Sequence, residues 1–337
     1  MKAVAYQSPG PIDRAEALVD IDLPLPVAQG HDLLVQVQAV SVNPVDTKVR
    51  KSAAPPAGEW KVLGYDAAGT VVATGPEVTG FKPGDQVFYA GSIARSGTNA
   101  EYHLVDSRIT GPKPASLSFS QAAALPLTAI TAWEMLFDRL NVIRPVPGAA
   151  PAVLIIGGAG GVGSMAIQLL RARTDLTVIA TASRPETQAW VRELGAHHVI
   201  DHRQPLAPQV AALGLGAPGH VFSTTQTQDH LAGIVELIAP QGRFGLIDDP
   251  TELDIRPFKR KSVSVHWELM FTRPLFATPD MDEQGKLLAQ VAALVDSGKL
   301  RSTLTETYGP ITAANLRRAH GLIETGTARG KIVLEGF

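Results

Sequence analysis

The sequence predicts an α/β protein in which a doubly wound parallel sheet is inserted into a β-rich domain. Three observations support this prediction. A glycine cluster at Gly158–Gly163 stands between an apolar strand pattern and a helical pattern. After Pro151, strand and helix patterns alternate, which is typical of parallel sheets covered by helices. A last strand pattern, Lys331–Leu334, most simply returns the chain to the N-terminal sheet.

The N-terminal part, from Met1 to about Gly111, has the pattern of a β-rich domain. Apolar and polar residues alternate as in a half-buried strand, and Gly-Pro and Pro-Gly pairs mark turns. A helical region from Phe119 to Leu140 follows and is interrupted by Pro126. The expected strands here are Val35–Val40, Thr70–Ala73 and Asp85–Tyr89.

The alternating region contains six short β-branched or apolar runs, which suit one parallel sheet. Helices are expected around 163–173, 186–194 and 229–238, with a short one between Asp201 and Gly219, and a later helix at Gln284–Ser297. We therefore expect one domain from residues 1–125 and 274–337 and a second from residues 126–273. The six strands are Val153–Ile156, Val178–Ala182, His198–Ile200, His220–Ser223, Arg243–Ile247 and Ser262–Trp267.

The glycine cluster fits the spacing G-x-G-x-x-G between a strand and a helix. In a Rossmann fold the first glycine makes the tight turn, the second lets the backbone approach a pyrophosphate, and the third packs the helix against the strand. The phosphates then face the N-terminus of the helix. A second βα unit follows, so the sequence predicts a dinucleotide site at Gly158, Ala159, Gly160, Gly161, Val162 and Gly163.

The end of the next strand indicates which dinucleotide binds. An NAD-preferring site usually places a carboxylate there for the ribose 2′-hydroxyl, and none occurs between Leu176 and Pro185. Ser183 and Arg184 suit a 2′-phosphate instead, since arginine binds phosphate with charge-assisted hydrogen bonds. The sequence favours NADP(H), with the alternative that Arg184 only begins the following helix.

Composition excludes several classes of function. The 337 residues include no cysteine, which rules out disulfides, thiolate zinc sites and a cysteine nucleophile. A net charge of −2, with Lys259–Lys261 as the longest basic run, does not indicate nucleic-acid binding. The N-terminus lacks the apolar segment of a signal peptide, and no run is long enough to span a membrane. We expect a cytoplasmic protein without a membrane or nucleic-acid partner.

Several motifs, in order along nearly the whole chain, resemble the medium-chain dehydrogenase/reductase superfamily. They are most similar to its quinone oxidoreductase branch, and within it to bacterial zinc-type alcohol dehydrogenase-like proteins. The resemblance implies a GroES-like β-rich domain, a Rossmann domain and a cleft between them. It also implies NADPH-dependent reduction of quinones, enones or related activated carbonyl compounds. The motifs are Ser41–Arg50, Leu63–Val72, Phe81–Val87, Ala122–Trp133, the glycine cluster and Glu193–Asp201.

The resemblance also predicts that this chain has no catalytic zinc. Asn43 matches a cysteine ligand of zinc-dependent relatives, and Tyr65 and Asp66 match a His-Glu pair. Catalytic zinc needs three protein ligands of N, S or O type, and this set is a poor substitute. Two alternatives to the quinone or enone reductase stay open: a catalytically idle nucleotide-binding protein and a zinc-dependent alcohol dehydrogenase.

Without a metal, hydrogen-bond donors must stabilise the charge on a substrate oxygen. The resemblance places Asn43, Asp46, Lys48 and Tyr65 near the cleft, with Tyr65 and Lys48 as donors. Three of these residues have a structural alternative. Asn43 before Pro44 could cap a turn, Asp46 could be a helix N-cap, and Tyr65 could be a packing residue.

Further cofactor contacts are expected from Thr128, from Ser223, Thr224 and Thr225 at the carboxyl edge of the sheet, and from Ile247. The resemblance places Thr128 near the nicotinamide; alternatively, its hydroxyl binds backbone near Pro126. Asp248-Asp249 before Pro250 is interpreted as a solvated turn. Because Val263–Phe271 would form an apolar edge strand, we expect a homodimer.

Overall fold

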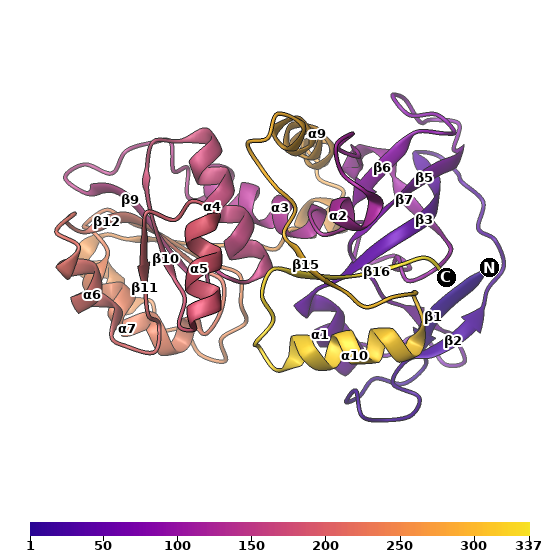
Figure 1. Cartoon of the computed structure of the whole chain (residues 1–337), viewed down its shortest axis with the longest axis horizontal. Helices are drawn as coiled ribbons and strands as arrows, with labels where there is room; N and C mark the ends of the chain where they lie inside the picture. Colours follow the sequence, from indigo (N-terminus) through magenta and orange to yellow (C-terminus); the bar gives the residue numbers. More distant parts are fainter. The chain divides into compact units, whose positions relative to one another are not determined.

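The computed structural model describes the chain from Met1 to Phe337, and the chain divides into two compact units. Unit 1 comprises Met1–Ile130 and Phe271–Phe337, and unit 2 comprises Thr131–Met270. The sequence led us to expect the limits after residues 125 and 273. Figure 1 shows the predicted insertion of a helix-covered sheet into a β-rich unit. None of the helices combines the length and apolar character needed to cross a membrane.

Unit 2 is built on a six-stranded sheet in which all neighbours are parallel. Its order is that of doubly wound dinucleotide-binding sheets, and the direction of winding switches between β9 and β12. All six predicted strands are present; β11 has the predicted bounds, and the other five are shifted at one or both ends. They are β9 (Ala150–Ile156), β10 (Thr177–Thr181), β11 (His198–Ile200), β12 (Pro218–Ser223), β13 (Arg243–Leu246) and β14 (Ser264–Trp267), in the order β11-β10-β9-β12-β13-β14.

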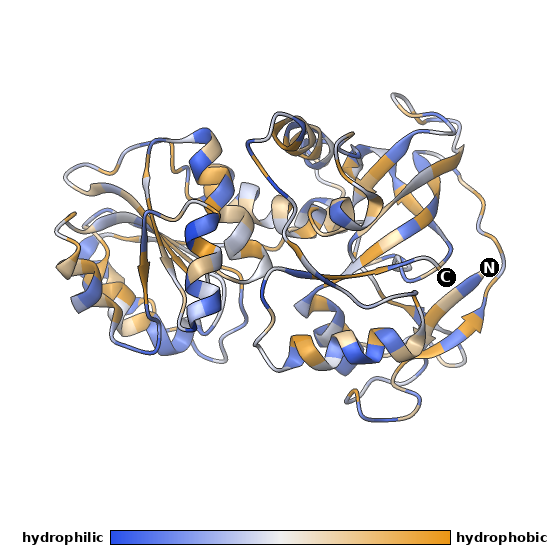
Figure 2. Cartoon of the chain, viewed as in Figure 1, coloured by the Kyte–Doolittle hydropathy of each residue, from blue (hydrophilic) through white to orange (hydrophobic).

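Helices bury both faces of this sheet, which explains why its strands are apolar at successive positions. Leu154 and Ile156 of β9 pack in one core with Ile234 of α7 and Val210 of α6. The central strands are largely hydrophobic in Figure 2. The helices are α4 (Gly161–Arg173), α5 (Pro185–Glu193), α6 (Leu206–Ala212) and α7 (Thr227–Leu237); a 3₁₀-helix, η3, spans Arg256–Lys261.

Unit 1 contains two sheets. A small antiparallel sheet has the order β2-β1-β4, from β2 (Val19–Asp22), β1 (Lys2–Tyr6) and β4 (Lys61–Val62). The larger sheet has seven strands in the order β15-β16-β3-β5-β6-β8, with β7 also paired to β3. Its strands are β15 (Leu304–Thr307), β16 (Lys331–Glu335), β3 (Asp32–Val42), β5 (Ala67–Thr74), β6 (Gln86–Tyr89), β8 (Gly111–Pro112) and β7 (Tyr102–Asp106).

The C-terminal strand β16 returns to the N-terminal sheet, as the sequence predicted. It pairs antiparallel with β3, and its register sets Ile332 opposite Val42. Since Lys331 precedes Ile332, and Asn43 follows Val42, the strand pairing brings these two distant residues together. This register positions the polar cluster described below.

The helices of unit 1 differ in how clearly the sequence marks them. α1 begins at Pro44, after the N-cap Asn43. α10 was not predicted, because its buried residues Leu316, Ala319 and His320 include a polar side chain and weaken the apolar pattern. The helices are α1 (Pro44–Ser52), α2 (Phe119–Ala123), α8 (Thr272–Phe276), α9 (Glu283–Asp296) and α10 (Ala313–Glu324). α3 (Pro126–Trp133) and the π-helical turn η2 (Glu134–Arg139) follow α2.

Candidate functional site

The glycine loop of unit 2 joins β9 to α4 and has no room for a Cβ atom at several of its glycines. Gly157 turns the chain with a φ of +82°. A Cβ on Gly163 would lie 2.3 Å from the Gly157 carbonyl oxygen, so this glycine is needed for the helix to pack on the strand. A Cβ on Gly160 would meet only one atom, at 3.6 Å. The second glycine of the motif therefore leaves space beside the backbone at the N-terminus of α4.

A second arginine joins the predicted pair at the end of β10. Arg184 is the N-cap of α5, and its Nε lies 3.2 Å from a carboxylate oxygen of Glu186. Arg203 donates from Nη2 to the Ser183 carbonyl at 2.7 Å and also pairs with Asp201. Both guanidinium groups are partly or largely exposed. The sequence motif missed Arg203, because it follows the neighbouring strand β11.

The hydroxyls after β12 lie against the glycine loop. Thr224 donates to the Ile156 carbonyl at 2.9 Å, and a Cβ on Gly157 would touch both Thr224 and Thr225. Ser223 is buried and shares a 2.7 Å hydrogen bond with Thr227. Thr225 is exposed. Thus the sheet edge brings the predicted hydroxyl residues to the loop, but Ser223 is already engaged within the protein.

Two residues after β13 differ in their surroundings. Ile247 is half-buried at the carboxyl end of the sheet. Asp248 accepts hydrogen bonds from the backbone nitrogen and hydroxyl of Thr227, at 2.9 and 2.5 Å. The prediction that Asp248 belongs to a solvated turn is therefore wrong, because its carboxylate holds the first turn of α7.

In unit 1, the start of α1 fixes two of the predicted residues in the interior. Asn43 and Asp46 are each 1% exposed. Asp46 accepts hydrogen bonds from the backbone nitrogens of Asn43, at 2.7 Å, and Gly64, at 3.0 Å. The helix-cap alternative is corrected in one respect: Asn43 is the N-cap, and Asp46 is the N3 residue that reaches back to it.

Asn43 also belongs to a buried polar group that we call the Asp66 cluster, made of Asn43, Asp46, Asp66 and Lys331. Asn43 Nδ2 donates to Asp66 Oδ2 at 2.7 Å. Lys331 Nζ donates to the same Asp66 oxygen at 3.0 Å, to the Val42 carbonyl at 3.0 Å, and to Asn43 Oδ1. The other Asp66 oxygen accepts from the Leu127 backbone nitrogen at 2.7 Å. Every partner of this carboxylate is a donor.

The electrostatics of the cluster are dominated by burial. Burial raises the pKa of Asp46 to about 7, against the lowering influence of its Asn43 hydrogen bond and of Lys331. Burial also raises the pKa of Asp66, while Lys331 and Asn43 act in the opposite direction. For Asp66 the geometry favours the ionised form, since a protonated carboxyl would need an acceptor and its partners are all donors. Asp66 is thus a carboxylate that faces the Lys331 ammonium, and Asp46 is a second acidic group near that cation.

Tyr65 lies beside this cluster but is more enclosed than the sequence indicated. It is 1% exposed, and its ring packs edge-on against Phe271 with centroids 5.4 Å apart. Its hydroxyl has no hydrogen-bond partner in the protein. Burial raises the pKa of Tyr65, with the Asp46 carboxylate adding to the effect, so the hydroxyl keeps its proton. Tyr65 is therefore a packing residue, as one interpretation of the sequence held, and its hydroxyl is a buried donor that no protein group uses.

Two other predicted residues, Lys48 and Thr128, do not belong to the Asp66 cluster. Lys48 is exposed on α1, whereas the cluster residues of that segment are buried. Thr128 is 2% exposed, and its hydroxyl donates to the Leu125 carbonyl at 3.0 Å. For Thr128, the contact seen is the backbone bond near Pro126 that the sequence analysis gave as its alternative.

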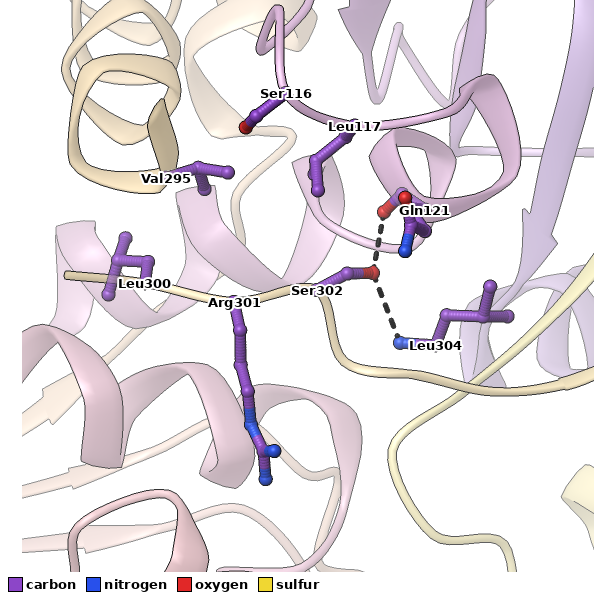
Figure 3. A pocket seen from close by; sticks show the side chains of 8 residues that line it. All are labelled: Ser116, Leu117, Gln121, Val295, Leu300, Arg301, Ser302 and Leu304. Atoms are coloured by element: carbon purple, nitrogen blue, oxygen red, sulfur yellow. Dashed lines mark hydrogen bonds between the residues drawn. The ribbon is translucent and has the colours of Figure 1, made fainter. Parts of the chain in front are cut away.

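Unit 1 also has an open cavity of about 400 Å³ that includes none of the predicted site residues. In Figure 3, Ser302 accepts from the Leu304 backbone and donates to the Gln121 carbonyl, while the Arg301 side chain extends away from them. Half of the lining side chains are apolar, and Arg301 is the only titratable one. Its residues are Ser116, Leu117, Gln121, Val295, Leu300, Arg301, Ser302 and Leu304.

The positions that match zinc ligands do not form a zinc site. No three histidine, cysteine, aspartate or glutamate side chains converge as metal ligands. The acceptor oxygens of Asn43 and Asp66 are bonded to Lys331 and to other donors. Zinc prefers nitrogen and sulfur donors or carboxylates in an open tetrahedral set, and these occupied oxygens do not fit it.

Two members of the cluster were not predicted from the sequence. Asp66 was expected only as a poor substitute for a zinc ligand, and Lys331 only as part of a terminal strand. A usable signal was present: a lysine at the first position of an otherwise apolar strand, Lys331–Leu334, is unusual because lysine is seldom fully buried without a partner. The partner, however, lies nearly the whole chain away.

Two known families match separate parts of the chain. The alcohol dehydrogenase GroES-like domain family matches residues 29–123, and the zinc-binding dehydrogenase family matches residues 194–334. A zinc-type alcohol dehydrogenase-like protein of Staphylococcus aureus (strain MSSA476) is 39% identical over 336 residues, which cover 99% of both chains.

Solved structures are similar over the whole chain. A Rhizobium etli CFN 42 protein named for the zinc-dependent alcohol dehydrogenases is 68% identical, with a TM-score of 0.99 over 100% of this chain and 98% of that one. A quinone oxidoreductase from Coxiella burnetii is 28% identical, with a TM-score of 0.80 over 100% and 99%. A mycobacterial protein solved with NADPH is 25% identical, with a TM-score of 0.82 over 99% of both chains. The chain belongs to the medium-chain dehydrogenase/reductase superfamily of oxidoreductases.

Proposed function

We propose that this protein is an NADPH-dependent oxidoreductase that transfers hydride to quinones, enones or related activated carbonyl compounds. The observation that carries the proposal is the glycine loop, in which Gly163 packs against Gly157 and Gly160 leaves the helix terminus open. This arrangement suits a pyrophosphate at the N-terminus of α4. The similarity to a quinone oxidoreductase and to a protein solved with NADPH supports the same assignment.

NADP(H) is the proposed cofactor because of the charge at the end of β10. Ser183, Arg184 and Arg203 stand there, and two guanidinium groups suit a 2′-phosphate better than a ribose 2′-hydroxyl. Asp201 is held by Arg203 and thus neutralises part of this charge. When bound, the nicotinamide would supply the hydride, and the protein's residues would bind and orient it.

Activated carbonyl compounds are the proposed substrates because they need no Lewis acid. Hydride addition to an enone or quinone spreads negative charge onto an oxygen, which hydrogen-bond donors can stabilise. Tyr65 offers a protonated hydroxyl without a protein partner. Because that hydroxyl is enclosed, a substrate oxygen reaches it only after local opening of the packing around Phe271.

The test is a turnover assay with purified protein. NADPH oxidation should be measured with a panel of quinones and enones, and NADP⁺ reduction with simple primary and secondary alcohols. The proposal expects turnover with activated acceptors and negligible alcohol oxidation, both unchanged by a chelator. Faster turnover of alcohols, or loss of activity in chelator, contradicts it. NADPH binding without turnover of any acceptor would favour the idle nucleotide-binding protein.

A further inference from the structure

A buried pair of carboxyl groups lies in unit 2, and no step proposed above uses it. Glu134 belongs to the π-helical turn η2, and Glu268 directly follows the edge strand β14. The two residues are 1% and 5% exposed, and their side chains are hydrogen-bonded to each other. We infer that Glu134 and Glu268 share one proton, and that this proton holds η2 against the end of β14. The inference is independent of the substrate and the cofactor proposed above.

The hydrogen-bonding groups of the pair require this proton. Glu268 Oε2 accepts from Arg139 Nε at 2.7 Å. Oε1 of the same carboxyl group is buried and receives no hydrogen bond from an N–H or hydroxyl group. Ionised carboxylates are acceptors only, so Glu134 and Glu268 can bond to each other only if one of them is protonated. One proton also balances the charge, since the Arg139 guanidinium then faces a single buried carboxylate.

The π-helical turn brings both partners of Glu268 to one side of the chain. In an α-helix, side chains three or four positions apart share a face, whereas Glu134 and Arg139 are five positions apart. In η2 the Leu140 nitrogen donates to the Met135 carbonyl, five residues earlier, at 2.8 Å. This wider turn sets position i+5 near position i. A glutamate and an arginine at this spacing can therefore both contact Glu268 because the turn is π-helical.

The surroundings keep the proton on the pair at neutral pH. Burial raises the pKa of Glu268 to about 8, and the Glu134 carboxylate adds to this effect, while Arg139 acts in the opposite direction. His266 of β14 is the other titratable group near Arg139. Burial lowers the pKa of His266, and Arg243 of β13 and Arg139 lower it further, so this histidine stays neutral. Near pH 8 the carboxyl pair is thus the group of this site that changes charge.

The direction of the pH dependence follows from the raised pKa. Between the ordinary value of 4.5 and about 8, the folded pair keeps a proton that an opened, hydrated pair has lost. The stabilisation that this proton supplies is complete below pH 4.5 and is lost as pH rises through 8. Above that pH, two carboxylates face one guanidinium in the interior. The contact between η2 and β14 should then weaken, because an uncompensated buried charge is strongly destabilising.

Hydrogen exchange followed by mass spectrometry tests the inference, with each exchange rate referred to the intrinsic rate at the same pH. In the parent, peptides that cover η2 and β14 should lose at least about tenfold in protection between pH 6 and 9, relative to the central strand β9. Glu134→Gln keeps a hydrogen-bond donor for Glu268 but has no proton to lose, so its protection should stay constant. Infrared difference spectra at pH 7 should show a protonated carboxyl group in the parent that Glu134→Gln lacks.

Two further variants serve as controls. Glu252→Gln removes an exposed carboxylate of unit 2, and it should lose protection at η2 and β14 over the same pH range as the parent. Arg139→Met removes the cation that favours ionisation of the pair, so its loss of protection should move to higher pH. If Glu134→Gln does not fold, Glu268→Gln takes its place, since its amide can donate to Glu134 and does not titrate.

The inference is overturned if the parent shows no protonated carboxyl group that the glutamine variant lacks. Equal protection of η2 and β14 in the parent at pH 6 and 9 also overturns it, and this measurement decides the matter if neither glutamine variant folds. An equal loss of protection in the parent and in a folded glutamine variant would show that the pair does not hold η2 against β14.

Discussion

At the scale of single residues, two exposed arginines and one buried tyrosine can be tested by substitution. Arg184 and Arg203 bring positive charge to the end of β10 without belonging to the core. The Tyr65 hydroxyl, in contrast, is buried and has no hydrogen-bond partner in the protein. The two arginines are proposed to select the cofactor, and Tyr65 is proposed to activate the substrate.

Replacing Arg184 by alanine should weaken NADPH binding and leave NADH binding nearly unchanged. A hydrogen bond to a charged group contributes about 1.5–3 kcal/mol, which corresponds to roughly 10- to 150-fold in Kd. Dissociation constants for both cofactors, measured by fluorescence titration, test this. Arg192→Ala, an exposed arginine of the same helix, is the matched control. Equal affinity of the parent for NADPH and NADH would rule out the assignment.

Tyr65→Phe should lower activity and raise stability at once. Loss of one donor from a preorganised site costs about 100-fold in kcat. The same change deletes a buried hydroxyl without a partner, and such groups cost about 1–3 kcal/mol. We therefore expect a higher Tm, a lower kcat and unchanged NADPH affinity. A fall in Tm would show that the hydroxyl is bonded in the folded protein, and unchanged kcat with every acceptor would remove Tyr65 from the mechanism.

At the scale of elements, a helix N-terminus organises the polar cluster of unit 1, and another organises the glycine loop of unit 2. α1 begins beside the Asp66 cluster and buries its third residue, Asp46. α4 begins at the glycine loop and packs Gly163 against Gly157. In each case the first turn of the helix fixes the positions of the backbone groups around it.

Asp46 should make stability fall as pH rises. Its pKa is about 7 when folded, above the ordinary value of 3.8, so between these values the folded state binds the extra proton. This contribution is present below pH 4 and is lost as pH rises toward 7. It amounts to up to roughly 4 kcal/mol, at about 1.36 kcal/mol per pKa unit. Asp46→Asn should flatten the pH dependence of unfolding by denaturant between pH 4 and 8, and equal slopes in parent and variant would contradict this.

Gly163→Ala should disrupt the loop, because its new Cβ would meet the Gly157 carbonyl oxygen at 2.3 Å. We expect a loss of at least about 1–3 kcal/mol in stability, as for other overpacked sites, together with weaker NADPH binding. Gly321→Ala is the control: this glycine of α10 has open space around its Cβ position, and alanine there should stabilise the helix by up to about 1 kcal/mol. Similar effects of both changes would contradict the role given to Gly163.

At the scale of the whole molecule, we predict a homodimer formed through β14. This strand pairs with β13 on one side only, and Trp267 and Leu269 beside its open edge are 53% and 52% exposed. Unpaired edges with apolar side chains favour pairing with another chain. Light scattering should give twice the 35.6 kDa chain mass, and Trp267→Glu should reduce it. Ile143→Glu, which alters an apolar side chain of unit 2 that is 70% exposed, should not. A monomeric parent at micromolar concentration would end this proposal.

The sequence by itself determined the elements whose signals are local. The glycine spacing, the apolar runs and the turn residues predicted the six strands of the parallel sheet, including the three residues of β11. These signals are sufficient because the spacing of apolar residues, the residues of a turn and the length of a strand all depend on residues that are neighbours in the sequence. The return of β16 to the first sheet was also predictable, since a terminal apolar strand must bury its faces against an existing core.

Only the tertiary structure decided how the polar residues combine. Asn43 and Asp66 are 23 residues apart, and Lys331 joins them from a strand 265 residues beyond Asp66. Arg203 reaches Ser183 because β10 and β11 are neighbours. Lys48, on the same helix as Asp46, instead faces solvent. A local pattern shows that a residue is polar, but its partner is set by strand register and helix orientation, and the energy of a buried charge depends on that partner.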